Sequence, residues 1–271
     1  MNTTSDSWAL VTGASSGLGR ALAIQLAREG RSLILVGRDE RRLEEARSAC
    51  AAAGAGAIAI RADLSLPGAA EGLHARCVGD GMDVDFLVNN AGAGIFGESV
   101  GIPPDKLAAM IALNVTALTQ LCALFGADMK RKGRGAILNV GSFAGKQATP
   151  YFASYAASKS YVLRYSHALR AELAESGVQV TCLMPGYVRT AFDESAGASN
   201  AAYRAFSESN AMEAEAVAAI GLRAAGRGRA SVIAGARNKI AAFLLGLLPE
   251  SAIPFAQKLF LDRLVSGEGA A

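Results

Sequence analysis

The sequence predicts an α/β fold in which a doubly wound, mainly parallel sheet is covered by helices on both faces. Short apolar runs of strand length alternate with longer segments of helical periodicity along the chain. Each parallel return between strands needs a crossover connection, and each sheet face needs cover, so this alternation favours one sheet between two helical layers. Polar and glycine-rich motifs also follow several predicted strand ends, where such sheets bind ligands.

The predicted strands are apolar and bounded by polar residues or glycine, at residues 8–11, 32–36, 57–60, 85–88, 136–140, 179–183 and 231–233. The predicted helices have apolar positions at helical spacing, at residues 19–29, 40–53, 69–78, 104–132, 154–176 and 213–225. The stretch after the Pro185-Gly186 turn is rich in Ala, Ser and Asn, which predicts a covering loop plus a short helix. We expect residues 191–212 to form a substrate lid. A plain surface connection is the alternative.

Residues 236–271 predict a helical C-terminal extension to a single domain that spans residues 1–271. Apolar residues at near-helical spacing indicate that these helices bury one face. Core packing, a wall of the substrate pocket, contact with another subunit and contact with a membrane surface all stay open, and membrane contact is the least favoured.

Composition and charge narrow the function classes. A net charge of +3 over 271 residues does not indicate a nucleic-acid partner. Four widely spaced cysteines and two histidines predict neither a disulfide framework nor a metal site. The N-terminus lacks a secretory signal pattern, and no run of about eighteen uncharged apolar residues suggests a membrane span. We therefore expect a cytoplasmic protein.

Tyr155 and Lys159 are four residues apart in the run S154-Y-A-A-S-K159, with Ser142 upstream. On a helix this spacing puts both side chains on one face, and an ammonium beside a phenol lowers the phenol pKa. The pattern predicts a proton-transfer site, although the same spacing also occurs on ordinary helix surfaces.

The other motifs of the chain make this prediction more specific. Along the chain stand T12-G-A-S-S-G-L-G19, N89-N-A-G92, Asn114, Ser142, the Tyr155–Lys159 pair and P185-G186. In this order and spacing, over roughly residues 9–235, they resemble the short-chain dehydrogenase/reductase family. The resemblance implies a Rossmann-type fold, a nicotinamide dinucleotide cofactor and oxidoreductase activity.

The glycine loop follows the first predicted strand and opens the first helix. Such a loop lets a pyrophosphate approach the backbone and the N–H groups of the helix N-terminus. The residues expected there are Gly13, Ser15, Ser16, Gly17, Leu18 and Gly19. The loop also matches the Gly-x-Ser-x-Gly turn of α/β-hydrolases, but too little chain precedes it to supply an oxyanion loop.

After the second predicted strand, Gly37 and Arg38 stand where an acidic residue would bind the adenosine ribose in NAD-preferring proteins. A guanidinium can pair with a 2′-phosphate, so NADP(H) is favoured. Asp39 leaves NAD(H) open, and Arg38 could instead belong to a solvated charge run.

The resemblance implies further roles by position. It places the adenine near Asp63 and Leu64, although Asp63 could equally cap a turn. It places the rest of the cofactor, including the nicotinamide, against Asn89, Ala91, Gly92, Tyr155, Lys159, Pro185, Gly186, Val188 and Thr190. For the loop at 89–92, bracing the strand end is an equal alternative.

The resemblance also implies the chemistry. Tyr155 would be the acid or base, Lys159 would lower its pKa and hold the nicotinamide ribose, and Ser142 would bind the substrate oxygen. Asn114 would bind a water that connects Lys159 to solvent. The resulting prediction is an NADP(H)-dependent oxidoreductase, running as a reductase on an apolar small-molecule carbonyl or alcohol.

Two further expectations complete the prediction. Relatives pair through the helices that contain Asn114 and Tyr155, which implies a homodimer or homotetramer. A non-catalytic NADP(H)-binding sensor or scaffold on the same fold is the alternative function, although such proteins tend to lack the tyrosine or the lysine.

Overall fold

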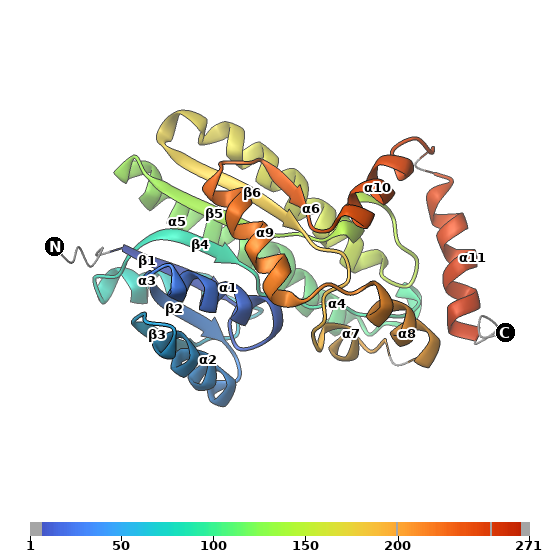
Figure 1. Ribbon diagram of the computed structural model, residues 1–271, viewed down its shortest axis with the longest axis horizontal. Coiled ribbons are helices and arrows are strands. Elements are labelled where there is room, and N and C mark those ends of the chain that lie inside the picture. The colour runs from blue at the N-terminus through green and yellow to red at the C-terminus, as the bar shows by residue number, and fades with distance from the viewer. Residues whose placement is uncertain (1–6, 199, 250, 267–271) are drawn as a thin grey trace.

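The computed structural model describes residues 7–198, 200–249 and 251–266, which build one twisted sheet between helical layers (Figure 1). The sheet has seven strands in the order β3-β2-β1-β4-β5-β6-β7, and every neighbouring pair is parallel. The strand bounds are β1 (Ser7–Thr12), β2 (Ser32–Gly37), β3 (Ala57–Arg61), β4 (Asp83–Asn89), β5 (Gly135–Val140), β6 (Val178–Met184) and β7 (Ser231–Ile233). The predicted doubly wound α/β fold is confirmed.

The helices lie close to the predicted segments. Their bounds are α1 (Gly17–Arg28), α2 (Glu40–Ala52), α3 (Ala69–Gly79), α4 (Pro104–Ile111), α5 (Leu118–Lys132), α6 (Ala153–Glu172), α7 (Phe192–Ser195), α8 (Ala201–Asn210), α9 (Ala214–Gly226), α10 (Ala236–Leu245) and α11 (Ile253–Ser266).

Alternation along the strands divides the core into two apolar clusters. Val11 and Leu35 belong to the cluster beneath α1, α2 and α9, whereas Leu10 and Ile34 belong to the cluster beneath α3, α5 and α6. Because successive side chains of a strand point to opposite faces, apolar runs of this kind are buried on both sides. The strand order reverses between β1 and β4, and such a reversal opens a ligand cleft at the carboxyl ends of the strands.

The predicted helix at residues 104–132 contains a π-helical segment, Ala112–Ala117, between α4 and α5. This whole run, Pro104–Lys132, is long and apolar enough to cross a membrane by length and composition. The sequence criterion of an unbroken apolar run did not detect it. Core helices of other proteins meet the same criterion, and Leu121, Phe125 and Met129 of α5 lie in the core.

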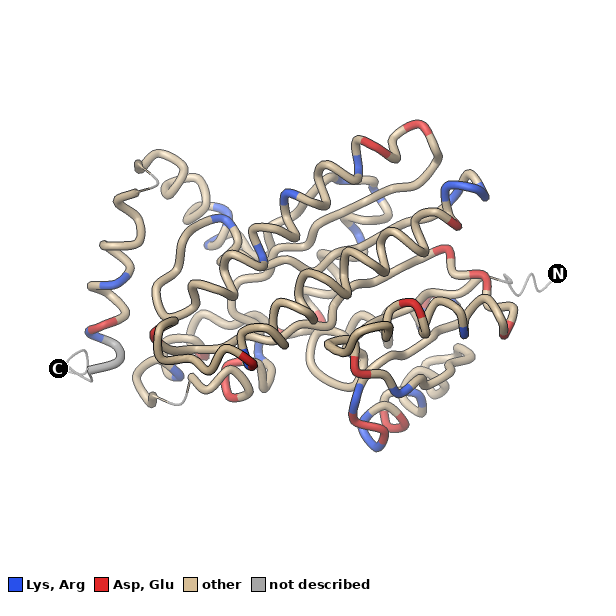
Figure 2. The backbone as a smooth tube through the Cα atoms, turned by 180° about the vertical axis from the view of Figure 1, so that it is seen from behind, with Lys and Arg blue, Asp and Glu red and all other residues tan. Residues whose placement is uncertain are grey.

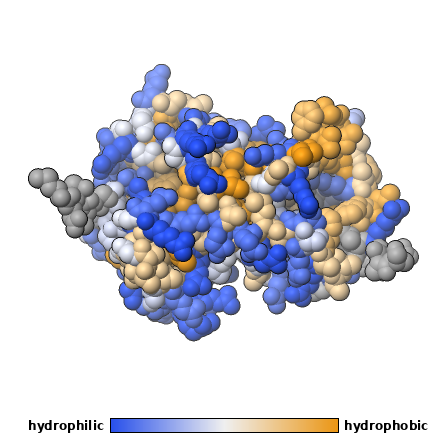
Figure 3. All heavy atoms as spheres, viewed as in Figure 1, coloured by the Kyte–Doolittle hydropathy of each residue, from blue (hydrophilic) through white to orange (hydrophobic). Residues whose placement is uncertain are grey.

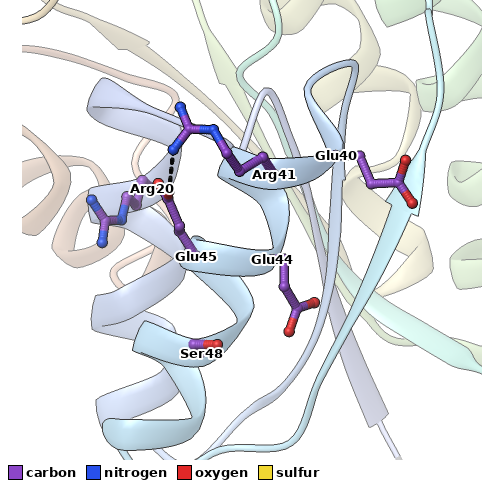
Figure 4. A pocket seen from close by; sticks show the side chains of 6 residues that line it. All are labelled: Arg20, Glu40, Arg41, Glu44, Glu45 and Ser48. Atoms are coloured by element: carbon purple, nitrogen blue, oxygen red, sulfur yellow. Dashed lines mark hydrogen bonds and ion pairs between the residues drawn. The ribbon is translucent and has the colours of Figure 1, made fainter.

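Charged residues of both signs are spread over the helices, and they alternate most densely along α2 (Figure 2). Arg41 pairs with Glu45 there, and Arg47 pairs with Glu44 at 2.5 Å. Three of these side chains, Arg41, Glu44 and Glu45, border a hollow over α1 and α2 (Figure 4). Its lining residues are Arg20, Glu40, Arg41, Glu44, Glu45 and Ser48. Exposed pairs of this kind contribute little to stability, because water screens the charges and the long side chains lose entropy, and we assign them no functional role.

The segment expected as a loop plus one helix contains two helices, α7 and α8. The Asn200 side chain caps α8 by accepting hydrogen bonds from Ala202 and Tyr203 backbone N–H groups, a signal that the sequence carried.

The C-terminal extension is helical as expected, but over most of its described part the apolar face is not buried within this chain. No residue of α10 is buried. Large apolar side chains of α10, α11 and the connection between them are exposed, and Figure 3 shows an apolar surface over this end of the molecule: Ile240, Phe243, Leu244, Leu247, Leu248, Phe255, Leu259 and Phe260. Apolar spacing therefore predicts the helices but not what covers their apolar faces, and residues 267–271 lie outside the described part.

Candidate active site

A cleft of about 1050 Å³ opens at the carboxyl ends of the strands. It gathers nearly all the residues predicted to bind the cofactor or the substrate, namely Gly13, Ser15, Ser16, Gly17, Leu18, Gly19, Arg38, Asp63, Leu64, Ala91, Gly92, Ser142, Tyr155, Lys159, Pro185, Gly186, Val188 and Thr190. Two predicted residues, Asn89 and Asn114, are not in its lining.

The glycine loop has the geometry of a phosphate-binding turn. Gly13 has a φ of +64°, and a Cβ on Gly19 would lie 2.2 Å from the Gly13 carbonyl oxygen. Position 19 therefore has no room for a side chain. The helix α1 begins within the loop, at Gly17. Free N–H groups at a helix N-terminus bind anions, so the loop fits the pyrophosphate of a dinucleotide.

Thr12 and Asn90 hold this loop against the next strand of the sheet. The Thr12 hydroxyl accepts hydrogen bonds from the backbone N–H groups of Asn90 (3.0 Å) and Ala91 (2.9 Å). The Asn90 amide donates in turn to the carbonyl oxygens of Thr12 (3.0 Å) and Gly13 (3.3 Å). Asn90 lines the cleft, and the sequence prediction had passed over it.

Asn89, which was predicted to line the cofactor, does not line the cleft. Asn89 is the last residue of β4, is buried, and donates hydrogen bonds to Asn139 Oδ1 (2.9 Å) and Cys122 Sγ (3.2 Å). Successive side chains of a strand point to opposite sides. A shift of one position along the chain therefore separates Asn90, which lines the cleft, from Asn89, which lies in the core. The bracing role is the one that the structure supports.

Basic residues stand at the end of the cleft beyond β2. Arg38 is largely exposed and lies 3.8 Å from an oxygen of Asp63, and Arg42 lines the same part of the cleft. Partial burial works to raise the pKa of Asp63, but hydrogen bonds from Ser65 and the charge of Arg38 outweigh it and lower that pKa. Asp39 caps α2 by accepting from the Arg42 N–H at 3.0 Å. This cap uses one carboxylate oxygen of Asp39. The side chains of Arg38 and Arg42 both line the cleft.

Tyr155 and Ser142 meet inside the cleft. Burial raises the pKa of Tyr155 to about 12, a hydrogen bond with Ser142 opposes this rise, and the charge of Asp193 adds to it. The expected lowering by Lys159 is therefore not found in this structure. Desolvation of a phenolate outweighs an ammonium whose Nζ lies 5.8 Å from the Tyr155 ring centroid.

Lys159 is buried and donates a hydrogen bond to the carbonyl oxygen of Val140 at 2.9 Å. Its burial lowers the pKa of the ammonium to about 8. A lysine with a pKa close to neutrality can hold or release a proton under ordinary conditions, and one helical turn separates it from the phenol.

Asn114 lies behind Lys159, within the π-helical segment. Its amide oxygen accepts from the Ala93 N–H (2.9 Å), and its nitrogen donates to the Ala93 carbonyl (2.8 Å) and to Ser158 Oγ (3.0 Å). A Cβ on Gly92 would lie 3.2 Å from Asn114 Oδ1 and 3.3 Å from Lys159 Nζ. Asn114 thus fixes the loop against which Lys159 packs, and π-helical segments often occur at functional sites.

Aromatic side chains surround Tyr155 on the side away from the glycine loop. Phe152 and Phe192 contact its ring at centroid distances of 5.8 and 5.4 Å. Phe143, Phe152, Tyr187 and Phe192 line the cleft, whereas Phe96 and Tyr151 belong to the adjoining apolar cluster outside its lining.

Sequence reasoning missed the part of the lining that comes from the two last helices and from the lid segment. These residues include Asp193, Tyr203, Phe206, Arg237, Asn238, Gln257, Phe260 and Leu261. No motif distinguished them, because their place in the cleft depends on how α8, α10 and α11 pack.

The hydrolase alternative lacks its histidine in this cleft. His74 instead pairs with Asp128 at 2.8 Å and contacts the Phe125 ring edge-on, and neither His74 nor His167 is in the lining. Among the described residues, no cluster of three or more His, Cys, Asp or Glu side chains could hold a metal ion.

A glycine loop at a strand-order reversal, next to a buried lysine and a half-buried tyrosine and serine, defines a class of protein: oxidoreductases that use a dinucleotide cofactor. The chain belongs to the short chain dehydrogenase family, whose pattern matches residues 7–216. An uncharacterized oxidoreductase of Myxococcus xanthus is 34% identical over 67% of this chain and 72% of its own length. The ketoacyl reductase HetN of Nostoc is 33% identical over 69% of this chain. The match covers 66% of HetN, so the chain spans about two thirds of that relative.

Solved structures agree with the family. A short-chain dehydrogenase from Sphingobium yanoikuyae in complex with NADPH is 29% identical, with a TM-score of 0.77 over 90% of this chain and 96% of that one. A 7β-hydroxysteroid dehydrogenase is 27% identical, with a TM-score of 0.84 over 95% and 100% of the two chains.

Proposed function

We propose that this protein is an NADP(H)-dependent oxidoreductase that interconverts a carbonyl and a secondary alcohol, and that it works as a reductase on an apolar substrate. The observation that carries the proposal is the half-buried Tyr155, hydrogen-bonded to Ser142, in the same cleft as the glycine loop. The matched family and its oxidoreductase members support this reaction class.

The raised pKa of Tyr155 suits the reductive direction. A phenol with a pKa of about 12 keeps its proton at neutral pH, so Tyr155 is ready to donate that proton to the substrate oxygen. Ser142 donates a hydrogen bond to the same oxygen as negative charge develops there. Lys159 then supplies positive charge one helical turn away, which stabilises the phenolate left behind.

A bound nicotinamide cofactor supplies the hydride for this reaction. The residues that would hold it are the glycine loop for the pyrophosphate, Asp63 for the adenine, and Val188 with Thr190 for the nicotinamide. Arg38 and Arg42 would bind a 2′-phosphate, which favours NADP(H). Structural relatives crystallised with NADPH and with NADP support this choice.

The apolar lining favours a substrate with an apolar body. Phe143, Phe152, Tyr187 and Phe192 surround the reacting side of the cleft. The structural relatives include a 7β-hydroxysteroid dehydrogenase and an alcohol dehydrogenase specific for bulky-bulky ketones, and both names support a large carbonyl substrate.

The lid and the assembly are part of the proposal. We infer that α7 and α8, within residues 191–212, cover the substrate, and that the described chain works as one unit with its C-terminal helices. Family membership supports a cytoplasmic homodimer or homotetramer paired through the helical run Pro104–Lys132, which contains Asn114, and through α6, which contains Tyr155. Sedimentation velocity should give the mass of two or four chains, and a monomer at micromolar concentration would contradict this part.

The alternative is a non-catalytic NADP(H) sensor on the same fold. A screen of cyclic and linear ketones, followed by NADPH and NADH absorbance, distinguishes the two. We expect turnover with NADPH, and we expect Tyr155→Phe to lower kcat by about 10²–10⁴-fold with little change in NADPH affinity, because the phenol proton is lost but little bulk is removed. NADPH binding without turnover by the wild type would favour the sensor, and full activity in the variant would exclude Tyr155 as the acid.

A further inference from the structure

Five buried side-chain nitrogen or oxygen atoms lack a hydrogen-bond partner in the described residues: Arg31 Nε, Asn89 Oδ1, Gln147 Oε1, Thr149 Oγ1 and Gln257 Oε1. Three of them, on Gln147, Thr149 and Gln257, belong to residues that line the cleft. A buried polar atom left unpaired costs about 1–3 kcal/mol. Such atoms at a binding site indicate a ligand group that pairs with them.

None of these three residues belongs to the glycine loop or to the segment after β2. Gln147 and Thr149 follow β5 and precede α6, and Gln257 lies on α11. Figure 1 shows α11 at the opposite end of the molecule from β3 and α2, where Arg38 and Asp63 stand. Leu261, one turn after Gln257, packs into the apolar cluster that also contacts Tyr155.

A second set of contacts brings the two segments together. The Tyr151 hydroxyl donates a hydrogen bond to Asp262 of α11, and Lys258 Nζ lies 5.7 Å from the Tyr151 ring centroid. Tyr151 is two residues after Thr149, and Lys258 directly follows Gln257. The loop of Thr149 and the helix of Gln257 therefore lie against each other at one end of the cleft.

We propose that Gln147, Thr149 and Gln257 form a polar subsite for a neutral hydrogen-bond-donating group, a hydroxyl or an amide N–H, at the far end of an apolar ketone substrate. The proposal rests on the reductase function above and narrows its substrate class. All three unpaired atoms are oxygens, and amide oxygens accept hydrogen bonds without donating them. A carboxylate or a phosphate offers only acceptors, so it could pair with the Thr149 hydroxyl but not with the two glutamine oxygens.

The surroundings support an amphipathic ligand. Phe152 and Phe192 contact the Tyr155 ring, and the loop of Thr149 meets the helix of Gln257 in the same cleft. A substrate that places its carbonyl at Tyr155 and an apolar body against Phe152 would carry its polar group toward Gln257. A site built to bind a hydroxyl discriminates against the analogue that lacks it, because its own polar atoms are then left unpaired.

Three probes that share one apolar body test this proposal. They are 4-(4-hydroxycyclohexyl)cyclohexanone, its methyl ether, and 4-cyclohexylcyclohexanone. The ether keeps an acceptor oxygen but loses the donor. With NADPH, we expect kcat/KM for the hydroxy ketone to exceed that for both others by about tenfold, which corresponds to one or two hydrogen bonds.

Single substitutions in the cleft test whether the three polar residues cause the preference for the hydroxy ketone. Gln257→Leu, Gln147→Leu and the near-isosteric Thr149→Val should each reduce the preference for the hydroxy ketone, while kcat/KM for 4-cyclohexylcyclohexanone changes less than about threefold. Gln179→Leu makes the same chemical change at an exposed position of β6 and should leave the preference intact. NADPH affinity and thermal unfolding of each variant show whether the fold is preserved.

The outcomes separate the two proposals. Equal kcat/KM for the three ketones, or a preference that all three cleft variants retain, would overturn the polar subsite and leave the reductase function standing. A preference for the methyl ether over the hydroxy ketone would also overturn it. Failure of the wild type to reduce any of the three ketones, with NADPH bound, would instead count against the proposed function itself.

Discussion

At the scale of single residues, burial decides the chemistry of the site. The sequence placed Tyr155 and Lys159 on one helical face, and the structure confirms that they are neighbours on α6. The direction of the Tyr155 pKa was nonetheless wrong, because both side chains lie in an apolar interior that penalises their charged forms. Spacing predicts which groups meet, whereas their ionisation depends on everything that excludes water from them.

Arg38 offers a direct test of cofactor choice. Arg38→Asp should weaken NADPH binding by about 10–100-fold, since a charge-assisted hydrogen bond contributes about 1.5–3 kcal/mol, and should change NADH binding much less. Fluorescence titration with both cofactors measures this. Arg41→Asp is the matched control, because Arg41 pairs with Glu45 outside the cleft. Equal loss of both cofactors in Arg38→Asp would rule out a phosphate role.

Lys159 should make stability depend on pH. Burial lowers its pKa from an ordinary 10.5 to about 8, so between these values the unfolded chain binds more protons than the folded one. The contribution of Lys159 to the free energy of unfolding therefore rises with pH across this window. Below pH 8 the buried ammonium costs about 3 kcal/mol, at about 1.4 kcal/mol per pKa unit.

Replacing this ammonium should relieve that cost. Lys159→Met should raise the free energy of unfolding by about 1–3 kcal/mol at pH 7, with part of the gain offset by the unpaired Val140 carbonyl. The gain should shrink by pH 9.5, where Lys159 of the folded wild-type protein is already mostly neutral. Urea unfolding of both proteins at the two pH values measures it. A difference that is the same at both pH values would contradict the lowered pKa.

At the scale of elements, local sequence rules predicted the loops and helix ends better than the helix interiors. The glycine loop, the Asp39 cap of α2 and the α6 helix agree with rules that need only a few neighbouring residues. The π-helical segment at Ala112–Ala117 could not be predicted, because it depends on Asn114 meeting Ala93 and Ser158 from other parts of the chain.

The glycine loop gives a prediction at this scale. In Gly19→Ala the new methyl group would lie 2.2 Å from the Gly13 carbonyl oxygen, so the loop must shift. We expect at least about a tenfold loss of NADPH affinity and a loss of about 1–3 kcal/mol in stability. Isothermal titration and urea unfolding measure the two effects.

Gly72→Ala is the control for this variant. Gly72 lies within α3 with open space around it, so alanine should stabilise the protein by up to about 1 kcal/mol and leave NADPH affinity unchanged. Normal cofactor binding by Gly19→Ala would show that the close approach in the loop is not needed for the pyrophosphate.

At the scale of the whole molecule, the C-terminal helices complete the cleft while leaving much of their own surface exposed. Gln257, Phe260 and Leu261 of α11 line the cleft, although no motif marked them. Their apolar spacing was visible in the sequence, but spacing does not say what a helix packs against.

The contact between α11 and the Tyr151 loop should therefore control substrate binding. Asp262 accepts a hydrogen bond from the Tyr151 hydroxyl and pairs with Lys258 at 2.7 Å. Asp262→Ala should raise the KM for ketones about two- to tenfold and leave the Kd for NADPH unchanged, because the cofactor residues lie on other elements. Steady-state kinetics and cofactor titration measure both.

The exposed Asp80, which pairs with Arg76 at the end of α3, provides the control variant Asp80→Ala. It removes an exposed ion pair of the same kind away from the cleft and should change neither constant. An unchanged KM in Asp262→Ala would mean that α11 keeps its position without this contact.

By itself, the sequence determined the doubly wound sheet, the glycine loop and the tyrosine–lysine–serine set, because these follow from periodicity and from motifs of a few residues. The tertiary structure decided which of Asn89 and Asn90 faces the cleft, how burial shifts the pKa values of Tyr155 and Lys159, and that Gln257 joins Thr149 at its far end. Each of these depends on segments far apart in the chain that meet only when the layers pack.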